Sequence, residues 1–257
     1  MDPLRRQLHD ARLYLVCDIR PDALITAALR GGVDVLQLRD KRADDATLVA
    51  AGRRYAALCA AHGAIFILND RPDLALDAHA AGVHVGQDDA SVQAAREFVG
   101  PARIVGLSTH TPEQIAQAGE RDVDYIGVGP VHATPTKPGR SAVGTALVRE
   151  AAARAARPFF AIGGIDPTNV AAVRDAGAQR IAVVRAITDA AEPESAARIL
   201  RAAICAPAGR DGTPGAAPAA PAGSAGSEAP AGSAGSEALA GPAPPAGWEA
   251  GIGRAQP

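Results

Sequence analysis

Short apolar runs alternate with longer helical stretches over residues 13–205 of the chain. The short runs are rich in β-branched residues and have the length of buried strands, whereas the stretches between them, such as 45–63, carry their apolar residues at helical spacing. Several stretches begin with a capping residue and a proline, as at 111–112 and 166–167, and one ends at Gly177. The pattern predicts strands within the segments 13–18, 33–40, 64–70, 82–89, 103–110, 124–131, 159–165 and 180–187.

Eight alternations of strand and helix predict an α/β fold, a single (β/α)8 TIM barrel. A doubly wound open sheet is the alternative, because it has the same alternation. The near-uniform repeat, and a sequence without a glycine-rich dinucleotide-binding motif, favour the closed barrel. In such barrels the chemistry takes place at the C-terminal ends of the strands.

The composition changes near residue 207 and divides the chain into two predicted regions. We expect residues 1–206 to form the catalytic barrel. Residues 207–257 are rich in Ala, Gly, Pro and Ser, and they repeat AGSAGSEA at 222–229 and 231–238. Such a segment has little apolar surface to bury, so we expect a disordered tail.

Charge and composition exclude several classes of protein. The formal net charge is -2, which gives no bulk attraction to nucleic acid or to an anionic membrane. The sequence has no apolar run long enough to span a bilayer, and its first residues lack the apolar core of a signal peptide. The 3 cysteines are too far apart for a disulfide framework or a metal site. We therefore expect a cytoplasmic protein that binds small molecules, with no nucleic-acid or membrane partner; its oligomeric state stays open.

Two residue types are rare in this arginine-rich chain. Lys41 and Lys137 are its lysines, and Asn69 and Asn169 are its asparagines. Both lysines and Asn69 fall where the predicted strands end, at the rim that carries chemistry in a barrel. We interpret them as residues retained for function.

Two carboxylates end adjacent predicted strands. Asp70 follows Asn69, and Asp89 follows Gln87 closely. Oxygen ligands of this kind suit Mg²⁺, which commonly binds one or two carboxylates together with substrate phosphates. The alternative is that one of the two aspartates caps the following helix.

Cations and glycines on the same rim predict two anion sites. Arg39, Lys41 and Lys137, together with Mg²⁺, could neutralise a pyrophosphate, although they could instead form salt bridges among the rim charges. The glycine pair at 163–164, with the end of the last strand, is typical of a monophosphate site in barrels.

No nucleophilic triad is evident on the rim. His84 alternates with Val83 and Val85, so we expect a hydrogen-bonded core histidine there. Catalysis by positioning, and by stabilising a departing anion, fits these residues better than covalent catalysis.

These segments together resemble the thiamine-phosphate synthase family, in family order over about residues 10–205. The segments that carry the resemblance are QLRDK (37–41), ND (69–70), GVHVGQDD (82–89), GLSTHT (106–111), GPVHATPTK (129–137), AIGGI (161–165) and VVRAI (183–187). The resemblance implies Mg²⁺-dependent condensation of hydroxymethylpyrimidine diphosphate with hydroxyethylthiazole phosphate, which releases pyrophosphate.

The resemblance also implies roles for individual residues. Asp70 and Asp89 would bind Mg²⁺. The pyrimidine diphosphate would be held by Gln37, Arg39, Lys41, Asn69, Ser108 and Lys137, of which Arg39, Lys41, Ser108 and Lys137 would be catalytic. The thiazole phosphate would be held by Thr134, Thr136, Gly164 and the Val184–Arg185 backbone, and the remaining substrate-lining positions would be Leu38, Asp40 and Pro135.

The sequence departs from the family pattern at three of these positions. Asp40 and Asp88 stand where the family commonly has glutamate, and both keep the charge. Arg185 stands where the family often has serine; arginine is tolerated there if the phosphate contact is through the backbone N–H.

Three alternatives to this hypothesis are open. A thiazole tautomerase has no pyrophosphate to hold, so Asp70 and Asp89 argue against it. A Schiff-base isomerase or lyase needs a buried strand lysine, whereas Lys41 and Lys137 are expected on loops. A non-enzymatic scaffold is the third alternative.

Overall fold

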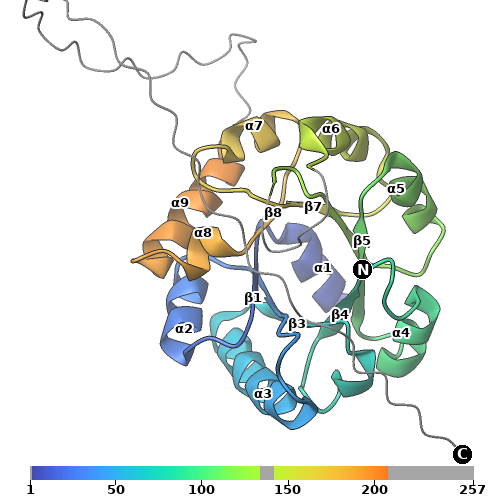
Figure 1. Ribbon diagram of the computed structural model, residues 1–257, viewed down its shortest axis with the longest axis vertical. Coiled ribbons are helices and arrows are strands. Elements are labelled where there is room, and N and C mark those ends of the chain that lie inside the picture. The colour runs from blue at the N-terminus through green and yellow to red at the C-terminus, as the bar shows by residue number, and fades with distance from the viewer. Residues whose placement is uncertain (1, 134–141, 208–257) are drawn as a thin grey trace, which may run out of the picture. The chain divides into compact units, whose positions relative to one another are not determined.

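The predicted barrel is confirmed. A computed structural model of the protein describes residues 2–133 and 142–207. Eight parallel strands close into a barrel in chain order, with β8 pairing β1 (Figure 1). The strands are β1 (Leu13–Cys17), β2 (Val35–Leu38), β3 (Ile65–Asn69), β4 (Gly82–Val85), β5 (Ile104–Thr109), β6 (Tyr125–Val128), β7 (Phe159–Ile162) and β8 (Ile181–Val183).

Helices surround the barrel, with one exception to the predicted alternation. The third strand is followed by a short 3₁₀ helix in place of an α-helix. The connection from Asp70 to Ala81 is short, and Pro72 lies near its start. The helical elements are α1 (Pro3–Asp10), α2 (Asp22–Arg30), α3 (Asp45–His62), η1 (Pro72–Leu74), α4 (Val92–Val99), α5 (Pro112–Gly119), α6 (Gly144–Arg154), α7 (Val170–Asp175), α8 (Arg185–Thr188) and α9 (Pro193–Cys205). No helix in the described part of the chain is long and apolar enough to cross a membrane.

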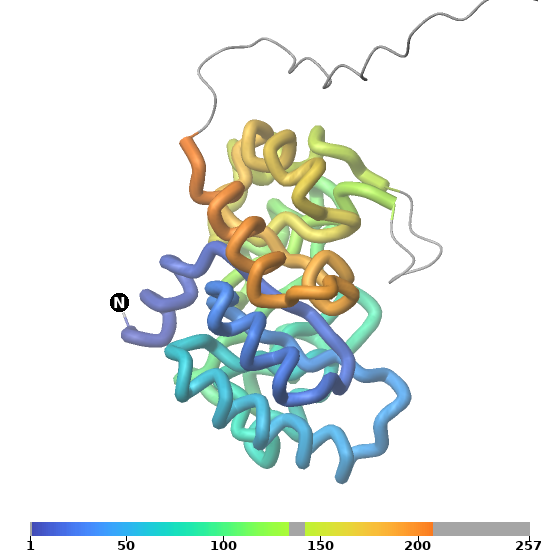
Figure 2. The backbone as a smooth tube through the Cα atoms, turned by 90° about the vertical axis from the view of Figure 1, so that its left-hand side faces the viewer, coloured from blue at the N-terminus to red at the C-terminus, as the bar shows by residue number. Residues whose placement is uncertain are grey.

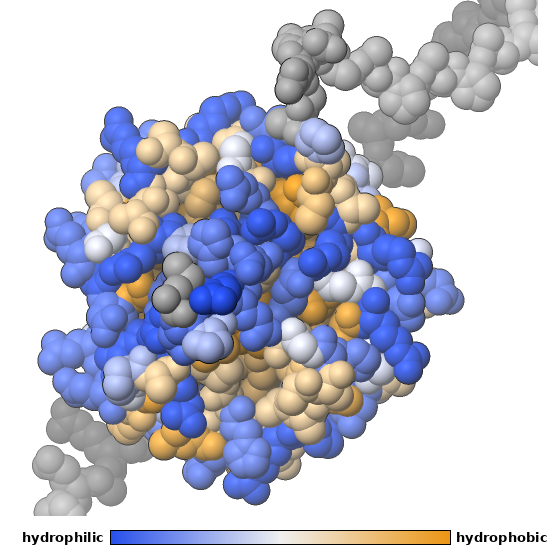
Figure 3. All heavy atoms as spheres, turned by 180° about the vertical axis from the view of Figure 1, so that it is seen from behind, coloured by the Kyte–Doolittle hydropathy of each residue, from blue (hydrophilic) through white to orange (hydrophobic). Residues whose placement is uncertain are grey.

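Helix α1, which the strand pattern did not predict, covers the N-terminal end of the barrel. Its Gln7 side chain donates to the Gly63 carbonyl just before β3, and Arg180, just before β8, donates to the His9 carbonyl. Figure 2 shows α1 at one end of the barrel, and Figure 3 shows hydrophilic residues gathered over the middle of that end. The opposite end, where the strands terminate, is therefore the one left for a site.

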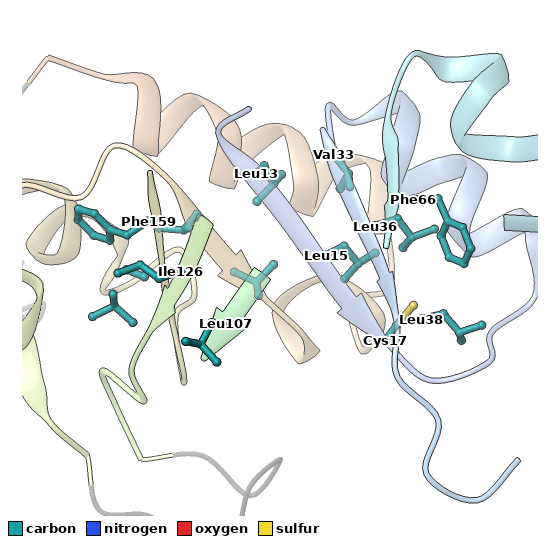
Figure 4. Packing of buried hydrophobic residues seen from close by; sticks show 14 of the residues in the cluster. Leu13, Leu15, Cys17, Val33, Leu36, Leu38, Phe66, Leu107, Ile126 and Phe159 are labelled. Atoms are coloured by element: carbon teal, nitrogen blue, oxygen red, sulfur yellow. The ribbon is translucent and has the colours of Figure 1, made fainter. Parts of the chain in front are cut away.

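Alternate strand residues build two layers of core. Leu13, Leu15 and Cys17 face outward and pack with Leu36 and Leu38 under the helices (Figure 4). The intervening residues face the barrel axis, where a second cluster contains Tyr14, Val16, Ile65, Ile67, Tyr125 and Phe160. The rings of Tyr14 and Phe160 meet edge to face with centroids 5.1 Å apart. Large aromatic side chains thus fill the barrel axis beneath the strand ends.

The three cysteines are expected to differ sharply in reactivity. Cys17 and Cys59 are buried, and burial raises the pKa of each thiol to about 12, whereas Cys205 is exposed. At pH 8 a thiol of pKa near 12 is thiolate in only about one molecule in ten thousand, and thiolate is the reactive form. Ellman's reagent should therefore modify one thiol rapidly in the folded protein and all three after unfolding in guanidinium. Rapid reaction of three thiols in the folded protein would contradict the packing of Cys17 and Cys59.

Candidate active site

The C-terminal ends of the strands surround a cavity of about 340 Å³. This volume is in the range of small-molecule pockets. Its floor is formed by the aromatic residues Tyr14, Tyr125 and Phe160, and polar side chains from several strands rise around them. The cavity therefore lies at the end of the barrel where the sequence predicts the site.

The end of β2 contributes two groups to the cavity. Gln37 is buried and Arg39 is half-buried, and both line the wall. The adjacent Leu38 side chain points the other way, into the core under the helices, so any substrate contact at this position would involve its backbone (Figure 4).

Asp40 fastens the loop after β2 to the loop after β1. Its carboxylate accepts hydrogen bonds from the backbone N–H groups of Ile19 at 3.3 Å and Arg42 at 3.0 Å. Burial works to raise the pKa of Asp40, but the backbone hydrogen bonds outweigh burial and hold this pKa below its usual value. Asp40 therefore stays charged and holds in place the segment that carries Lys41.

Two carboxylates meet beside β3 and β4. Burial raises the pKa of Asp70, the neighbouring Asp89 carboxylate raises it further, and Lys41 opposes them. The Lys41 Nζ lies 3.2 Å from Asp70 Oδ2, and Asp89 Oδ2 accepts the Gly86 N–H at 2.9 Å. Neither aspartate caps a helix, because Ser91 caps α4 and Arg71 precedes η1. The helix-capping alternative therefore does not apply.

The Asp70–Asp89 pair has the chemistry of a Mg²⁺ site. Asp70 is partly buried beside the exposed Asp89. Like charges held together repel each other, as the raised pKa of Asp70 indicates, and a divalent cation relieves that repulsion. No group of three or more potential ligands occurs among the described residues. Two carboxylates still suffice for Mg²⁺, because this ion usually keeps several waters and binds substrate phosphates.

The backbone at Asp70 is unusual, and Arg71 secures it. Asp70 has φ 59°, in the left-handed region, and its N–H donates to the His84 carbonyl at 2.8 Å. Arg71 then donates to Asp45 at 2.8 Å and to Asp73 at 2.7 Å, which ties the turn to the start of α3. The sequence analysis did not identify Arg71 as a residue that supports the site. The signal that could have found it is its place directly after Asp70, the predicted Mg²⁺ ligand.

The glycine pair after β7 forms the other side of the rim. Gly163 and Gly164 have φ 110° and 60°, which glycine adopts without strain. Asn169 fixes this turn: its Nδ2 donates to the Gly164 carbonyl at 2.8 Å, and its Oδ1 accepts the Asp166 N–H at 3.0 Å. Among the described residues no acceptor is found for the Gly164 N–H. The turn thus keeps a backbone donor available beside the cavity.

The remaining predicted residues are distributed as follows. Asn69 and Ser108 line the cavity, as do Gly164, Val184 and the exposed Arg185 beside the start of α8. His84 is buried with both ring nitrogens hydrogen bonded, as expected of a core histidine, but it also lines the cavity. Four predicted site residues lie outside the described residues, namely Thr134, Pro135, Thr136 and Lys137.

Comparison with known proteins places the chain in one family. The family model for thiamine monophosphate synthase matches residues 13–187. The thiamine-phosphate synthase of Thermus thermophilus is 52% identical over 198 residues, which cover 74% of this chain and 95% of that protein. The thiamine-phosphate synthase of Thermosynechococcus vestitus is 47% identical over 205 residues, covering 78% of this chain but 58% of that longer relative.

A solved structure agrees with these sequence matches. Thiamine phosphate pyrophosphorylase from Pyrococcus furiosus superimposes with a TM-score of 0.71 at 30% sequence identity, covering 78% of this chain and 97% of that chain. The barrel, the matched family model and these relatives lead to the same conclusion: the chain belongs to the thiamine monophosphate synthase family.

Proposed function

We propose that this protein joins 4-amino-2-methyl-5-(diphosphooxymethyl)pyrimidine to 4-methyl-5-(2-phosphooxyethyl)thiazole, giving thiamine phosphate and pyrophosphate. Family membership supports this reaction. The observation that carries it is a cavity whose lining includes both cationic and amide side chains and a glycine turn. Arg39 and Asn69 line one side near Lys41, and the glycine turn with Gly164 lines the other. Such a cavity suits two phosphorylated substrates that react with each other.

The carboxylate pair is proposed to bind Mg²⁺ on the diphosphate. When bound, the ion would supply positive charge that neutralises pyrophosphate. Asp70 and Asp89 would hold it, and Lys41 is already close enough to Asp70 to contact the same diphosphate. Arg39 would bind the diphosphate from the wall of the cavity.

The chain's own residues then act mainly by positioning. Gln37 and Ser108 would orient the pyrimidine above the aromatic floor, and Asn69 would help hold the diphosphate. The C–O bond of the pyrimidine methylene breaks and its electron pair leaves with pyrophosphate, while the lone pair of the thiazole nitrogen forms the new C–N bond. The cations stabilise the departing charge, and the fixed geometry brings the two reacting atoms together. Lys137 is proposed to add a further cation to the diphosphate.

The backbone near the glycine turn is proposed to hold the thiazole phosphate. The Gly164 N–H and the N–H groups at Val184 and Arg185 are the proposed donors, with Thr134 and Thr136 as additional ones. The Arg185 side chain, which is exposed at this rim, would add a positive charge to the same phosphate.

Turnover with both half-molecules tests the proposed reaction. Purified protein is incubated with both substrates in Mg²⁺ or in EDTA, and thiamine phosphate is followed by its fluorescent oxidation product. Product in Mg²⁺ and none in EDTA is expected. Folded protein that forms no product in Mg²⁺ would contradict the proposal and favour the tautomerase alternative.

Replacing Asn169 by aspartate should weaken binding of the thiazole phosphate selectively. Aspartate can still accept the Asp166 N–H, but it places a second oxygen against the Gly164 carbonyl where Nδ2 now donates. Loss of one such hydrogen bond is worth about 1 kcal/mol, so we expect KM for the thiazole phosphate to rise about fivefold. The KM for the pyrimidine diphosphate should stay unchanged.

Thr168→Val is the matched control for Asn169→Asp. The Thr168 hydroxyl donates to the Asp166 carboxylate at 2.6 Å, in the same turn, without touching Gly164. Both KM values should stay within about twofold of the wild-type values in this variant. Equal effects of the two substitutions on both substrates would show that Asn169 has no specific role at the phosphate.

The activity is proposed to reside in residues 1–206. A chain truncated after Ala206 should keep the turnover and the thermal stability of the full chain, because the barrel and the proposed catalytic groups lie before that point. A large loss of turnover on truncation would mean that residues 207–257 take part in the reaction.

The cytoplasmic location stays a prediction from the sequence.

A further inference from the structure

Five polar side chains form one chain of hydrogen bonds across the floor of the cavity. Gln37 Nε2 donates to the Tyr14 hydroxyl at 2.7 Å, which lies 2.8 Å from the Tyr125 hydroxyl. The Tyr125 hydroxyl lies 3.0 Å from His84 Nδ1, and His84 Nε2 lies 2.9 Å from Ser108 Oγ. The five residues come from β2, β1, β6, β4 and β5, so the chain links opposite walls of the barrel.

The members of this floor chain are shielded from water. Their exposed fractions lie between 1% for Tyr125 and 9% for His84. Burial, the largest influence on both, raises the pKa of the Tyr14 and Tyr125 hydroxyls well above the usual value. Each phenol is therefore neutral at physiological pH and has one hydrogen to donate.

The direction of the hydrogen bonds follows from the Gln37 end. Because Gln37 donates to Tyr14, the Tyr14 hydrogen needs another acceptor, and Tyr125 is the one found within the described residues. The Tyr125 hydrogen must then point to His84 Nδ1. His84 consequently carries its hydrogen on Nε2 and donates to Ser108 Oγ.

We propose that the floor chain makes Ser108 a hydrogen-bond donor to the ligand and couples its direction to the amide of Gln37 across the barrel. Since Ser108 Oγ accepts from His84, its own hydrogen is available to a ligand acceptor in the cavity, such as a ring nitrogen. Tyr14, Tyr125 and His84 are positioning residues in this arrangement. The identity of the ligand as a pyrimidine rests on the proposed function, whereas the direction of the chain does not.

The state of His84 tests the direction without any substrate. In full-length protein labelled with ¹⁵N-histidine at pH 9, the shifts of the two ring nitrogens distinguish the Nε2–H from the Nδ1–H form, and His84→Gln assigns the signal. The wild-type protein should show the Nε2–H form. An Nδ1–H form would overturn the proposal.

Gln37→Glu should reverse the chain. A carboxylate can only accept, so Tyr14 would donate to Glu at position 37, Tyr125 to Tyr14, and His84 from Nδ1 to Tyr125. The His84 signal should switch to the Nδ1–H form, although Tyr14 and Tyr125 lie between position 37 and His84 in the floor chain. A His84 signal that is the same in the wild-type protein and in Gln37→Glu would overturn the coupling.

Tyr125→Phe tests the consequence for binding. Its KM for the pyrimidine diphosphate should rise about fivefold, the size of one lost hydrogen bond, with KM for the thiazole phosphate unchanged. Tyr55→Phe is the matched control, because Tyr55 is also buried but its hydroxyl bonds to the Arg20 backbone outside the barrel axis. Equal kinetic effects in both variants would overturn the positioning role. A protein with the expected His84 states but no turnover would contradict the proposed function alone.

Discussion

Replacing Asp70 by asparagine is expected to lower turnover by about a thousandfold in saturating Mg²⁺, because it removes half of the carboxylate pair proposed to hold the ion that neutralises the diphosphate charge. Asparagine is the informative substitution here. It has nearly the same shape as aspartate, and it tolerates the left-handed conformation that Asp70 adopts at φ 59°. Alanine at this position would add backbone strain, so its effect on folding could not be separated from the loss of the carboxylate.

The same substitution should leave stability unchanged or raise it. Burial and the Asp89 carboxylate raise the pKa of Asp70 in the folded protein. A carboxyl with a raised folded-state pKa destabilises the fold once pH exceeds its ordinary pKa, so ionised Asp70 opposes folding at neutral pH. Thermal unfolding at pH 7.5 in EDTA should therefore give Asp70→Asn a Tm no lower than that of the wild-type protein.

Two controls make the Asp70 result specific. Asp89→Asn should lose turnover in the same way, and Asp175→Asn, which removes an exposed carboxylate paired with Arg174 on α7, should not. Addition of Mg²⁺ together with pyrophosphate should raise the Tm of the wild-type protein but not that of Asp70→Asn. Full turnover in Asp70→Asn, or the same Tm rise in both proteins, would refute the metal assignment.

Gly164→Ala is expected to raise KM for the thiazole phosphate about a hundredfold, with a smaller loss of stability. Alanine strains the backbone at φ 60°, and its Cβ would lie 2.8 Å from His132 Cβ and 2.9 Å from the Ala133 carbonyl oxygen. The turn has to move, which displaces the N–H that we assign to the phosphate. Steady-state kinetics with each substrate varied in turn measures the effect.

Gly63→Ala separates strain from function. Gly63 ends α3 at φ 66°, nearly the same conformation as Gly164, but an added Cβ there meets nothing within 4 Å. It should cost about 1 kcal/mol of stability and leave both KM values unchanged. If Gly164→Ala changes KM no more than Gly63→Ala does, the glycine turn is not the phosphate site.

The barrel could be predicted because each of its strands is a short run of consecutive apolar residues, which is visible in the sequence without knowledge of distant contacts. All eight apolar runs became strands, since a strand buried on both faces needs an uninterrupted apolar segment. Two helical elements were not anticipated. The polar sequence of α1 gives little apolar signal, with Leu8 as its buried residue, and η1 replaces a helix in a connection begun by Arg71-Pro72.

The candidate site could be predicted only where its residues stand out from the surrounding composition. Asp70, Lys41 and Gly164 come shortly after the ends of strands, so their position on the rim could be predicted from the sequence. Tyr14 and Tyr125 look like ordinary core aromatics, and their contact depends on which strands face each other across a closed barrel. Asn169 was noticed as rare, but its bond to the Gly164 carbonyl depends on how the turn folds.

One cavity is proposed to hold both anions, on separate sides. A crystal structure of the protein with thiamine phosphate, pyrophosphate and Mg²⁺ tests it most directly. We expect pyrophosphate beside Arg39 and Lys41 with the ion between Asp70 and Asp89, and the phosphate of the product on the Gly164 N–H. Pyrophosphate bound at the glycine turn, or an ion that contacts neither aspartate, would contradict it.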